Sequence, residues 1–424
     1  MTGGRFRKPI ATLALVFSSI VFSLIAGESA VRLLGSWNEE GAFYFRGRPV
    51  RPFVLPVNRA KRLLAEYRAA TDSHLMADPD LGWSYRPSSA SRDGLSRCNS
   101  QGLRADRDYS DIPPEGVLRV ALFGDSFIQG AGVGQTECLA PQMETALARR
   151  GVRAEVLNFG VSGYGFGQTL LRYRRDGRRF HPDLVIAGLQ LGNIKRDVNL
   201  FYLVIFPESG IFFTKPVFTL KAGRLDLANS PTLPIESIPA TLAEFDRSPL
   251  RPLETLVRDA DFTPHAWQRS KLLAVALDQL RRLRGRSPDE VQRPDGPAFQ
   301  LTQALIEEFR ADAEQSGSRF ELIYLPLRET LRACMRPGRD PFQPHLDRIA
   351  SRLSVVDPRP ALIAAARDSS FDALFASDQG HYSARGNGIV AAVLADEIAR
   401  GEETARRSSG TRPSPSFTAP PPSQ

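Results

Sequence analysis

The sequence predicts an α/β protein with a central parallel sheet, preceded by one N-terminal transmembrane helix. From residue 117 onward, short apolar runs alternate with stretches of helical periodicity, which is the pattern of right-handed βαβ units. At the N-terminus, an uncharged stretch of membrane-spanning length follows a cluster of basic residues. Together these observations indicate a folded α/β domain attached to a membrane anchor.

The N-terminal segment is the predicted anchor. A basic cytoplasmic segment, residues 1–8, precedes a transmembrane anchor, residues 9–28, whose helix at about 1.5 Å per residue can cross the hydrocarbon core. The basic residues predict a cytoplasmic N-terminus in the cell inner membrane, with the rest of the chain in the periplasm or outside. A cleaved signal peptide is the competing interpretation. The sequence favours the anchor, because neither Ala26 nor Ala30 has a small residue two positions earlier.

The composition indicates a globular protein and argues against two classes of function. Hydrophobic residues make up 42% and charged residues 24%, as in ordinary folded domains. The net charge of +8 favours anionic surfaces, but no basic stripe interleaves with aromatics, so we expect no nucleic-acid binding. Cys98, Cys138 and Cys334 form no CxxC pair and no zinc-ligand cluster, so we expect no metal and no cofactor. One disulfide with a free thiol, or three free thiols, both remain open.

The segments after the anchor differ in pattern. Residues 29–115 are predicted to form a helical stalk and an irregular lead-in, and residues 403–424 a disordered tail poor in apolar residues. The main domain, residues 116–402, carries an insertion at about 201–315 that contains a small hairpin. Strands are predicted at 118–123, 154–158, 183–190 and 320–325. Helices are predicted at 136–149, 166–179, 265–284, 298–316, 341–353 and 382–400.

The run Gly124-Asp125-Ser126 follows the first strand directly and precedes a glycine-rich turn. A serine at the carboxyl end of a parallel strand lies at the sheet edge where open α/β folds bind their ligands. The following turn can point a backbone N–H at an oxyanion. Taken alone, the tripeptide is also compatible with an ordinary strand-to-helix turn in which the serine caps the helix.

Two further loops follow the second and third strands. The glycines of the run from Asn158 to Gly167 allow a ligand to approach the backbone, and Gly163 can supply an N–H donor. After the third strand, the side-chain amide of Asn193 can donate to a developing negative charge, and such a donor contributes about 2.7–4 kcal/mol in a transition state. Taken alone, the glycine run could be an ordinary flexible loop, and Asn193 could simply cap the next segment.

A nucleophilic serine needs a base, and the base needs an orienting carboxylate. Of the five histidines, only His381 has an aspartate three residues before it, Asp378, so this pair is the candidate base and orienting group. His181 precedes a proline at a helix-to-strand junction and is interpreted as structural. The carboxyl ends of parallel strands share one edge, so the three loops should meet there, with His381 reaching them from the C-terminal segment.

In their order along the chain, these blocks resemble those of the SGNH/GDSL hydrolase superfamily, over residues 118–198 and 319–400. The resemblance implies a three-layer α/β/α flavodoxin-like fold. It implies that Ser126 is the nucleophile and that Asp378 and His381 complete its triad. It also implies an oxyanion hole made of the Ser126 amide, Gly163 and Asn193.

One position departs from the superfamily pattern. Its third block usually reads Gly-x-Asn-Asp, whereas Ile194 follows Asn193 here, and Asp197 is a candidate to replace the missing acid. The lead-in runs at 80–83 and 99–104 resemble the segment before the GDS motif in membrane-anchored bacterial members.

The resemblance implies a membrane-tethered serine esterase that acts on acyl or acetyl esters of a cell-envelope carbohydrate, such as an acetylated glycan, or of a lipid. A polysaccharide O-acetyltransferase with the same acyl-enzyme chemistry is one alternative. A non-catalytic glycan-binding scaffold is the other. Aromatic residues of the insertion fit either plain packing, which we favour, or an apolar substrate cleft; they are Phe201, Tyr202, Phe206, Phe212 and Phe213.

Overall fold

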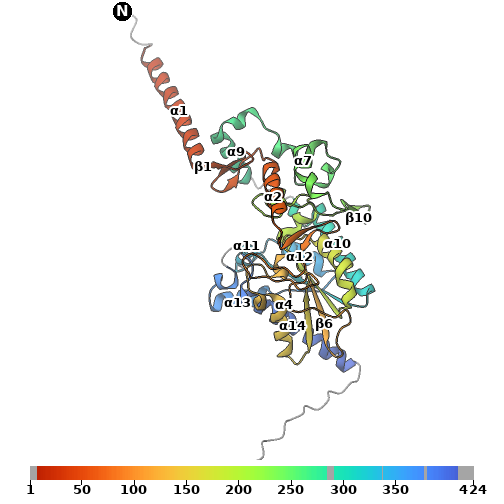
Figure 1. Ribbon diagram of the computed structural model, residues 1–424. Helices are drawn as coiled ribbons and strands as arrows, with labels where there is room; N and C mark the ends of the chain where they lie inside the picture. The colour runs from red at the N-terminus through yellow and green to blue at the C-terminus, as the bar shows by residue number, and fades with distance from the viewer. Residues whose placement is uncertain (1–6, 284–290, 337, 377–379, 409–424) are drawn as a thin grey trace, which may run out of the picture. The chain divides into compact units, whose positions relative to one another are not determined.

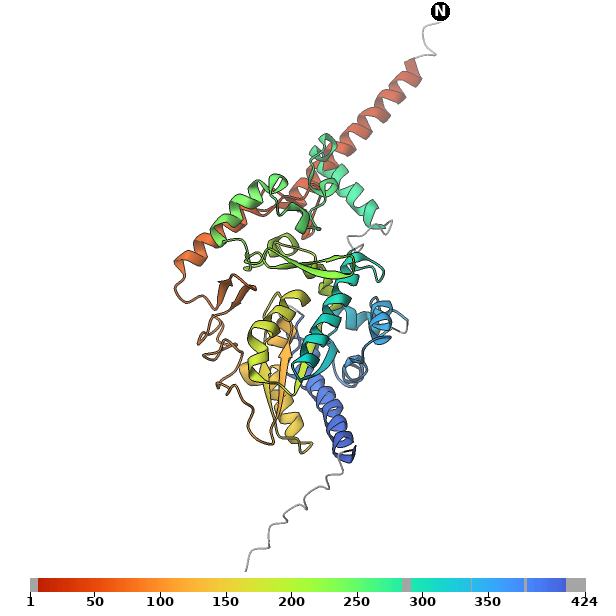
Figure 2. The same cartoon turned by 90° about the vertical axis from the view of Figure 1, so that its right-hand side faces the viewer.

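The computed structural model describes residues 7–283, 291–336, 338–376 and 380–408 (Figures 1 and 2). The chain divides into two compact units. The anchor unit comprises Met1–Trp83 and Ile194–Ala304, and the sheet unit comprises Ser84–Asn193 and Leu305–Gln424. Each unit is therefore built from two segments that are distant in sequence.

The sheet unit contains a five-stranded sheet in which every pairing is parallel. Its strands are β6 (Leu118–Phe123), β7 (Ala154–Asn158), β8 (Leu184–Leu189), β11 (Arg319–Tyr324) and β12 (Val355–Val356). The spatial order β12-β11-β8-β6-β7 is the flavodoxin-like order 2-1-3-4-5. In this order successive strands are added on one side of β6 and then on the other, so the switch point lies between β6 and β8. Ligands of such folds bind at the carboxyl ends of the strands at this point.

The four strands predicted from apolar runs are present with nearly the predicted bounds. Continuous burial explains why these runs were recognisable, because five of the six residues of β6 are buried. Strand β12 was missed because two valines are too short a run to give a pattern. Helix α14 (Ala384–Ser408) extends into the segment predicted to be a disordered tail, and residues 409–424 lie outside the described ranges.

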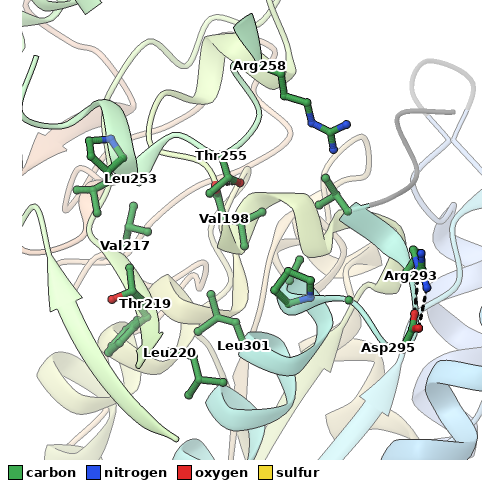
Figure 3. A pocket seen from close by; sticks show the side chains of 16 residues that line it. Val198, Val217, Thr219, Leu220, Leu253, Thr255, Arg258, Arg293, Asp295 and Leu301 are labelled. Atoms are coloured by element: carbon green, nitrogen blue, oxygen red, sulfur yellow. Dashed lines mark hydrogen bonds and ion pairs between the residues drawn. The ribbon is translucent and has the colours of Figure 1, made fainter. Parts of the chain in front are cut away.

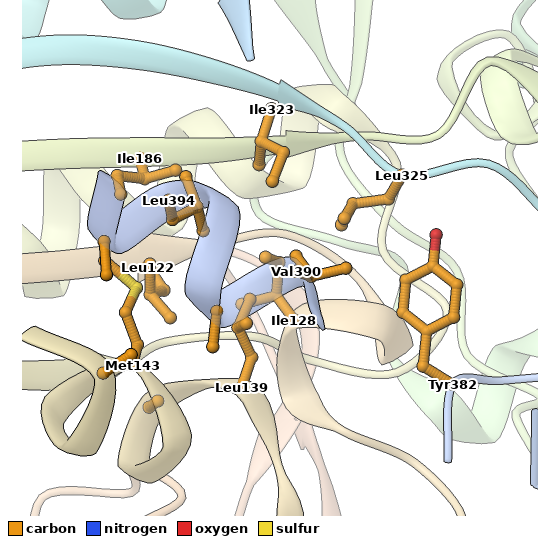
Figure 4. Packing of buried hydrophobic residues seen from close by; sticks show 14 of the residues in the cluster. Leu122, Ile128, Leu139, Met143, Ile186, Ile323, Leu325, Tyr382, Val390 and Leu394 are labelled. Carbon is orange, nitrogen blue, oxygen red and sulfur yellow. The ribbon is translucent and has the colours of Figure 1, made fainter. Parts of the chain in front are cut away.

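Helices cover both faces of this sheet and complete the three predicted layers. On one face lie α4 (Leu139–Ala148), α13 (Arg359–Asp368) and α14. Figure 4 shows Leu122, Ile186 and Ile323 of the sheet facing apolar side chains of α4 and α14. The face is apolar throughout, so its burial drives the packing of these helices.

The opposite face is aromatic. The ring of Phe123 stacks on Phe159 at 4.6 Å between centroids and meets the edges of Tyr173 and Phe309. Phe159 directly follows β7, whereas Tyr173 begins the π-helical continuation (Tyr173–Gly177) of α5 (Phe166–Arg172). Phe309 lies on the part of α10 (Pro297–Gln315) that belongs to the sheet unit. The remaining helices of the sheet unit are α3 (Ser126–Gln129), α11 (Arg328–Cys334) and α12 (Gln343–Ala350).

The anchor unit begins with α1 (Arg7–Leu34), whose stretch Thr12–Leu34 is long and apolar enough to cross a membrane. The next residues, predicted as part of a helical stalk, form a small antiparallel sheet of β1 (Gly35–Trp37), β2 (Phe43–Phe45) and β3 (Arg48–Pro49). Helix α2 (Val57–Ala69) follows this sheet. The strands form because Gly41 and Gly47 adopt the positive φ angles that two tight turns require.

The insertion also folds into the anchor unit. Its predicted hairpin is present as β9 (Val217–Lys221) and β10 (Arg224–Ala228), joined by Ala222 and Gly223, both at positive φ. The other elements are α6 (Tyr202–Ile205), α7 (Ile238–Ala243), α8 (Asp259–Phe262), α9 (Lys271–Leu283) and the first part of α10. Strand β4 (Leu75–Asp78) pairs with β5 (Gly82–Tyr85), where the chain passes between the units.

Four of the five aromatic residues singled out in the insertion are packing residues, and the fifth, Phe206, is half-buried against the ring of Tyr202. Phe201, Tyr202, Phe212 and Phe213 are all buried, and Trp83 packs edge-on against Tyr202. A pocket of about 530 Å³ in the same unit is lined instead mainly by aliphatic side chains, such as Val198, Val217 and Leu301 (Figure 3).

Arg119, near the start of β6, is a fully buried cation. Its guanidinium donates to the carbonyl oxygens of Phe180 and Asp111 at 2.6 and 2.9 Å, and to the carboxylate of Glu155 on β7 at 2.6 Å. Its backbone N–H donates to the carboxylate of Asp183, just before β8. One side chain and its backbone thus tie together the starts of three adjacent strands.

We expect Arg119→Met to destabilise the protein by about 3–5 kcal/mol, because it leaves the largely buried carboxylate of Glu155 and the buried carbonyl of Phe180 without their cation. Arg97→Met is the matched control, because the pair of Arg97 with Asp106 is about half exposed and contributes at most about 1 kcal/mol. Urea unfolding followed by circular dichroism measures both. Equal unfolding midpoints for the two variants would contradict a structural role for Arg119.

Candidate active site

Ser126 lies at the carboxyl edge of the sheet, at the start of the four-residue helix α3 that follows β6. Asp125 caps this helix, and its Oδ1 accepts from the N–H of Phe127 at 3.0 Å. The helix ends at Gly130, whose φ of 84° requires glycine. Both ends of α3 are thus fixed locally, and the serine is 7% exposed.

The buried side chain of Arg104 holds the turn after Ser126 in place. Its guanidinium donates to the carbonyl of Gln129 at 2.8 Å, to that of Gly130, and to that of Val133 at 2.7 Å. A helix of one turn leaves its last carbonyls without partners, and a planar fork of donors can bind several of them together. The run that contains Arg104 is recognisable in the sequence, but this role of its side chain is not.

The loop after β7 lies directly against α3. The side-chain amide of Asn158 donates to the carbonyl of Ile128 at 2.9 Å and its oxygen accepts from the N–H of Gly160. The N–H of Val161 donates to the carbonyl of Gly124, just before the serine. A Cβ on Gly160 would lie 2.4 Å from the backbone nitrogen of Gln129, so the backbones approach this closely only with glycine.

Gly163 follows in the same loop and has a φ of 86°. The preceding residue, Ser162, is held by Tyr85, whose hydroxyl donates to Ser162 Oγ at 3.0 Å and accepts from its N–H. The two residues directly before the glycine that is predicted to supply an oxyanion donor, Val161 and Ser162, are therefore both held by hydrogen bonds.

Asn193 is brought to Ser126 through Asp125. Its Nδ2 donates to Asp125 Oδ2 at 3.2 Å and to Gln190 Oε1 at 3.1 Å. The carboxylate that contacts this amide is thus the aspartate of the Gly124-Asp125-Ser126 run. Asp197, which the sequence analysis offered for that role, accepts a hydrogen bond from Thr302 in the anchor unit.

His381 meets Ser126 although 255 positions separate them in sequence. The distance between His381 Nε2 and Ser126 Oγ is 2.8 Å, and the imidazole packs on the ring of Phe127 at 5.0 Å. Next to His381, Tyr382 forms a β-bridge with Phe375. Burial raises the pKa of Tyr382 well above its usual value, so its hydroxyl stays protonated and donates to the carbonyl of Pro326.

The structure brings together Ser126, Asn193 and His381 among the residues predicted for the site. Asp378, the predicted orienting carboxylate, lies outside the described residues. His181 is exposed and adopts a left-handed conformation after a short 3-10 helix, in keeping with a structural role. Asp125, Arg104 and Gln190 complete the surroundings and were not predicted as site residues.

The three cysteines form no disulfide, and Cys98 and Cys138 are buried. Burial raises the pKa of the Cys98 thiol to about 12, so it stays protonated and is a poor nucleophile. Within the described ranges, no group of three His, Cys, Asp or Glu side chains could hold a metal ion.

We expect Gly160→Ala to destabilise the sheet unit by about 1–3 kcal/mol, because the added methyl group meets backbone atoms of α3 that cannot move independently. Gly210→Ala is the control, because nothing lies within 4 Å of a Cβ there. Thermal unfolding of both variants measures the difference. An unchanged midpoint for Gly160→Ala would show that the turn has room to adjust.

No protein-family model and no curated protein matches this chain. Among solved structures, it is similar to a G-D-S-L family protein from Desulfitobacterium hafniense DCB-2, with 11% identity and a TM-score of 0.33 over 66% of this chain and 98% of that one. It is also similar to the lipase/acylhydrolase from Enterococcus faecalis, with 15% identity and a TM-score of 0.32 over 67% of this chain and 97% of that one. A third similar structure is a catalytic mutant of an acetylxylan esterase from Geobacillus stearothermophilus, with 12% identity and a TM-score of 0.35 over 66% of this chain and 94% of that one.

The strand order and the positions of the blocks on it lead to the fold assignment. Ser126 follows the first strand of the order 2-1-3-4-5, Gly163 the second and Asn193 the third, and His381 precedes the last helix. The sheet unit therefore has a flavodoxin-like α/β/α fold, which is the fold that the resemblance to the SGNH hydrolases implies.

Proposed function

We propose that this protein is a membrane-tethered serine esterase that cleaves acyl or acetyl esters, with Ser126 as its nucleophile. The observation that carries the proposal is the 2.8 Å contact between His381 Nε2 and Ser126 Oγ at the carboxyl edge of a parallel sheet. A serine hydroxyl is a weak nucleophile until a base within hydrogen-bond distance removes its proton.

In the first step, Ser126 Oγ attacks the ester carbonyl carbon while His381 Nε2 takes the hydroxyl proton. Asp378 has the role of holding the other ring nitrogen and stabilising the imidazolium. The resulting tetrahedral intermediate collapses to an acyl-serine, and His381 returns the proton to the departing alcohol oxygen. The bond to Ser126 forms in the addition step and the bond between the carbonyl carbon and the alkoxy oxygen breaks on collapse, so charge and protons balance.

Three donors are proposed for the oxyanion: the backbone N–H groups of Ser126 and Gly163, and the Asn193 amide. The contacts of Asn193 with Asp125 and Gln190 support this role, because they fix the direction of its Nδ2 hydrogens. The acyl-serine then passes its acyl group to water activated by His381. A sugar hydroxyl in place of that water would make the same enzyme an O-acetyltransferase.

The proposed tether is α1, crossing the inner membrane once with its N-terminus in the cytoplasm and the sheet unit outside. The support is that its side chains from Thr12 to Ala26 are exposed on all sides, as expected of a helix surrounded by lipid. Proposed substrates are therefore the esters of the cell envelope, such as an acetylated glycan or a lipid.

We expect Ser126→Ala to lower kcat for p-nitrophenyl acetate by about 10³-fold or more, because the covalent step loses its nucleophile. Ser316→Ala, at an exposed serine at the end of the sheet unit's α10 segment, is the matched control and should hydrolyse at the wild-type rate. A wild-type rate for Ser126→Ala would refute the assignment. A fluorophosphonate probe should label the wild type and Ser316→Ala but not Ser126→Ala, and failure to label the wild type would favour a non-catalytic scaffold.

We expect Asp378→Asn to lower kcat on the order of 10⁴-fold, because an amide donor in place of the carboxylate holds the imidazole in the wrong tautomer. Asp372→Asn is a close control, because Asp372 is 68% exposed and pairs with Arg328 and Arg332 at the surface. Stopped-flow hydrolysis of the same ester compares the two variants. A loss of equal size in both would indicate damage to the loop and not to the triad.

A further inference from the structure

Helix α9 of the anchor unit exposes its apolar face to the surroundings. Leu273, Ala276, Leu280 and Leu283 recur at spacings of three, four and three residues, so they form one stripe along the helix. All four are exposed, and the three leucines are 43%, 41% and 83% exposed, respectively. A surface helix of a globular unit turns such a stripe inward, so this stripe needs a partner.

The inner face of α9 is engaged by other groups. Ala274 is buried in a small apolar cluster with Val31 of α1 and Phe43 of β2. Asp278, one turn later on the same face, is 5% exposed and accepts a hydrogen bond from the guanidinium of Arg51 at 2.5 Å. These contacts fix the rotation of the helix, so the leucine stripe cannot turn inward without breaking a buried ion pair.

The start of α9 lies beside the end of the uncharged part of α1. The Glu28 carboxylate accepts from the N–H groups of Lys271 and Leu272 and from Ser270 Oγ, so α1 supplies the N-terminal cap of α9. A Cβ on Gly27 would lie 3.1 Å from Leu272. Leu272 therefore lies at the level of Gly27, directly after the stretch of α1 that is exposed on all sides.

This level is where the proposed transmembrane helix leaves the hydrocarbon core. Figure 2 shows α9 running crosswise from the base of α1 and not alongside it. A helix in that direction, starting at that level, lies along the membrane surface when α1 spans the bilayer. Its exposed leucines are then at the depth where headgroups meet acyl chains.

The charged residues near the stripe are also suited to a membrane surface. Lys271 and Arg281 lie outside the buried face of α9, and both are positive. Trp37, 51% exposed, lies beside Lys271, with its ring 4.8 Å from Nζ. Basic and aromatic side chains next to an apolar face are the composition of helices that bind anionic membrane surfaces.

We propose that α9 is an interfacial membrane-binding helix, with the stripe of Leu273, Ala276, Leu280 and Leu283 inserted among anionic lipid headgroups beside α1. The proposal rests on the anchor part of the proposed function, but not on its chemistry. A second attachment point next to the first restricts rotation of the anchor unit about α1.

The experiment uses the full chain in lipid nanodiscs, one protein per disc, with Cys334→Ser as background because the other two cysteines are buried. An environment-sensitive fluorophore is attached at Leu280→Cys or Leu283→Cys. The matched control is Leu227→Cys on β10, a leucine of the same unit with 38% exposure. Discs contain phosphatidylcholine alone or with about one quarter phosphatidylglycerol, and brominated acyl chains serve as quenchers.

We expect bromine quenching at positions 280 and 283 to exceed that at 227 by at least about twofold, with blue-shifted emission. Adding phosphatidylglycerol should strengthen the quenching, because Lys271 and Arg281 attract anionic headgroups. Quenching at 280 and 283 no stronger than at 227, in both lipids, would overturn the proposal. Hydrolysis of p-nitrophenyl acetate by the same labelled proteins tests the esterase chemistry separately, so either proposal can fail alone.

Discussion

The arrangement of the candidate site depends on how the carbonyl groups of one short turn are satisfied. Helix α3 has a single turn, so it cannot bond its own last carbonyls. Arg104 and Asn158 supply the missing donors from two other segments, and Gly160 lets the second segment lie against the backbone. Two further groups of the site are placed relative to this turn. Asn193 is held by the cap residue Asp125, and the ring of His381 packs on Phe127.

The sheet and the loops that carry the site could be predicted from the sequence. Buried parallel strands have continuous apolar sequences, and the loops after them must meet at one edge of the sheet. The role of Arg104 could not be predicted, because its carbonyl partners are set by the path of the chain and not by a local pattern. The small sheet after α1 was missed for a similar reason: its strands are two or three residues long. The orienting role of Asp378 stays a prediction, since the residue lies outside the described ranges.

Helix α9 illustrates a second limit of sequence patterns. Its periodicity correctly predicts a helix, and the same periodicity would ordinarily place the leucines in a core. The orientation is decided instead by Arg51, a residue 227 positions away, which pairs with Asp278 in the interior. A buried ion pair is costly to break, so it outweighs the modest gain from turning leucines inward. The pattern of polar and apolar residues along such a helix therefore does not show which face packs against the rest of the unit.

The contacts of Asn193 bear on how the proposed oxyanion hole would discriminate between ground state and transition state. Both hydrogens of its amide are engaged, one by Asp125 and one by Gln190. Asp125 is charged and also caps α3, so Gln190 is the partner that a substrate oxygen can displace. A neutral ester carbonyl has little advantage over the neutral amide oxygen of Gln190, whereas a developing oxyanion has a large one. The exchange would then become favourable as charge develops, which is the condition under which a hydrogen bond lowers the barrier instead of only binding the substrate.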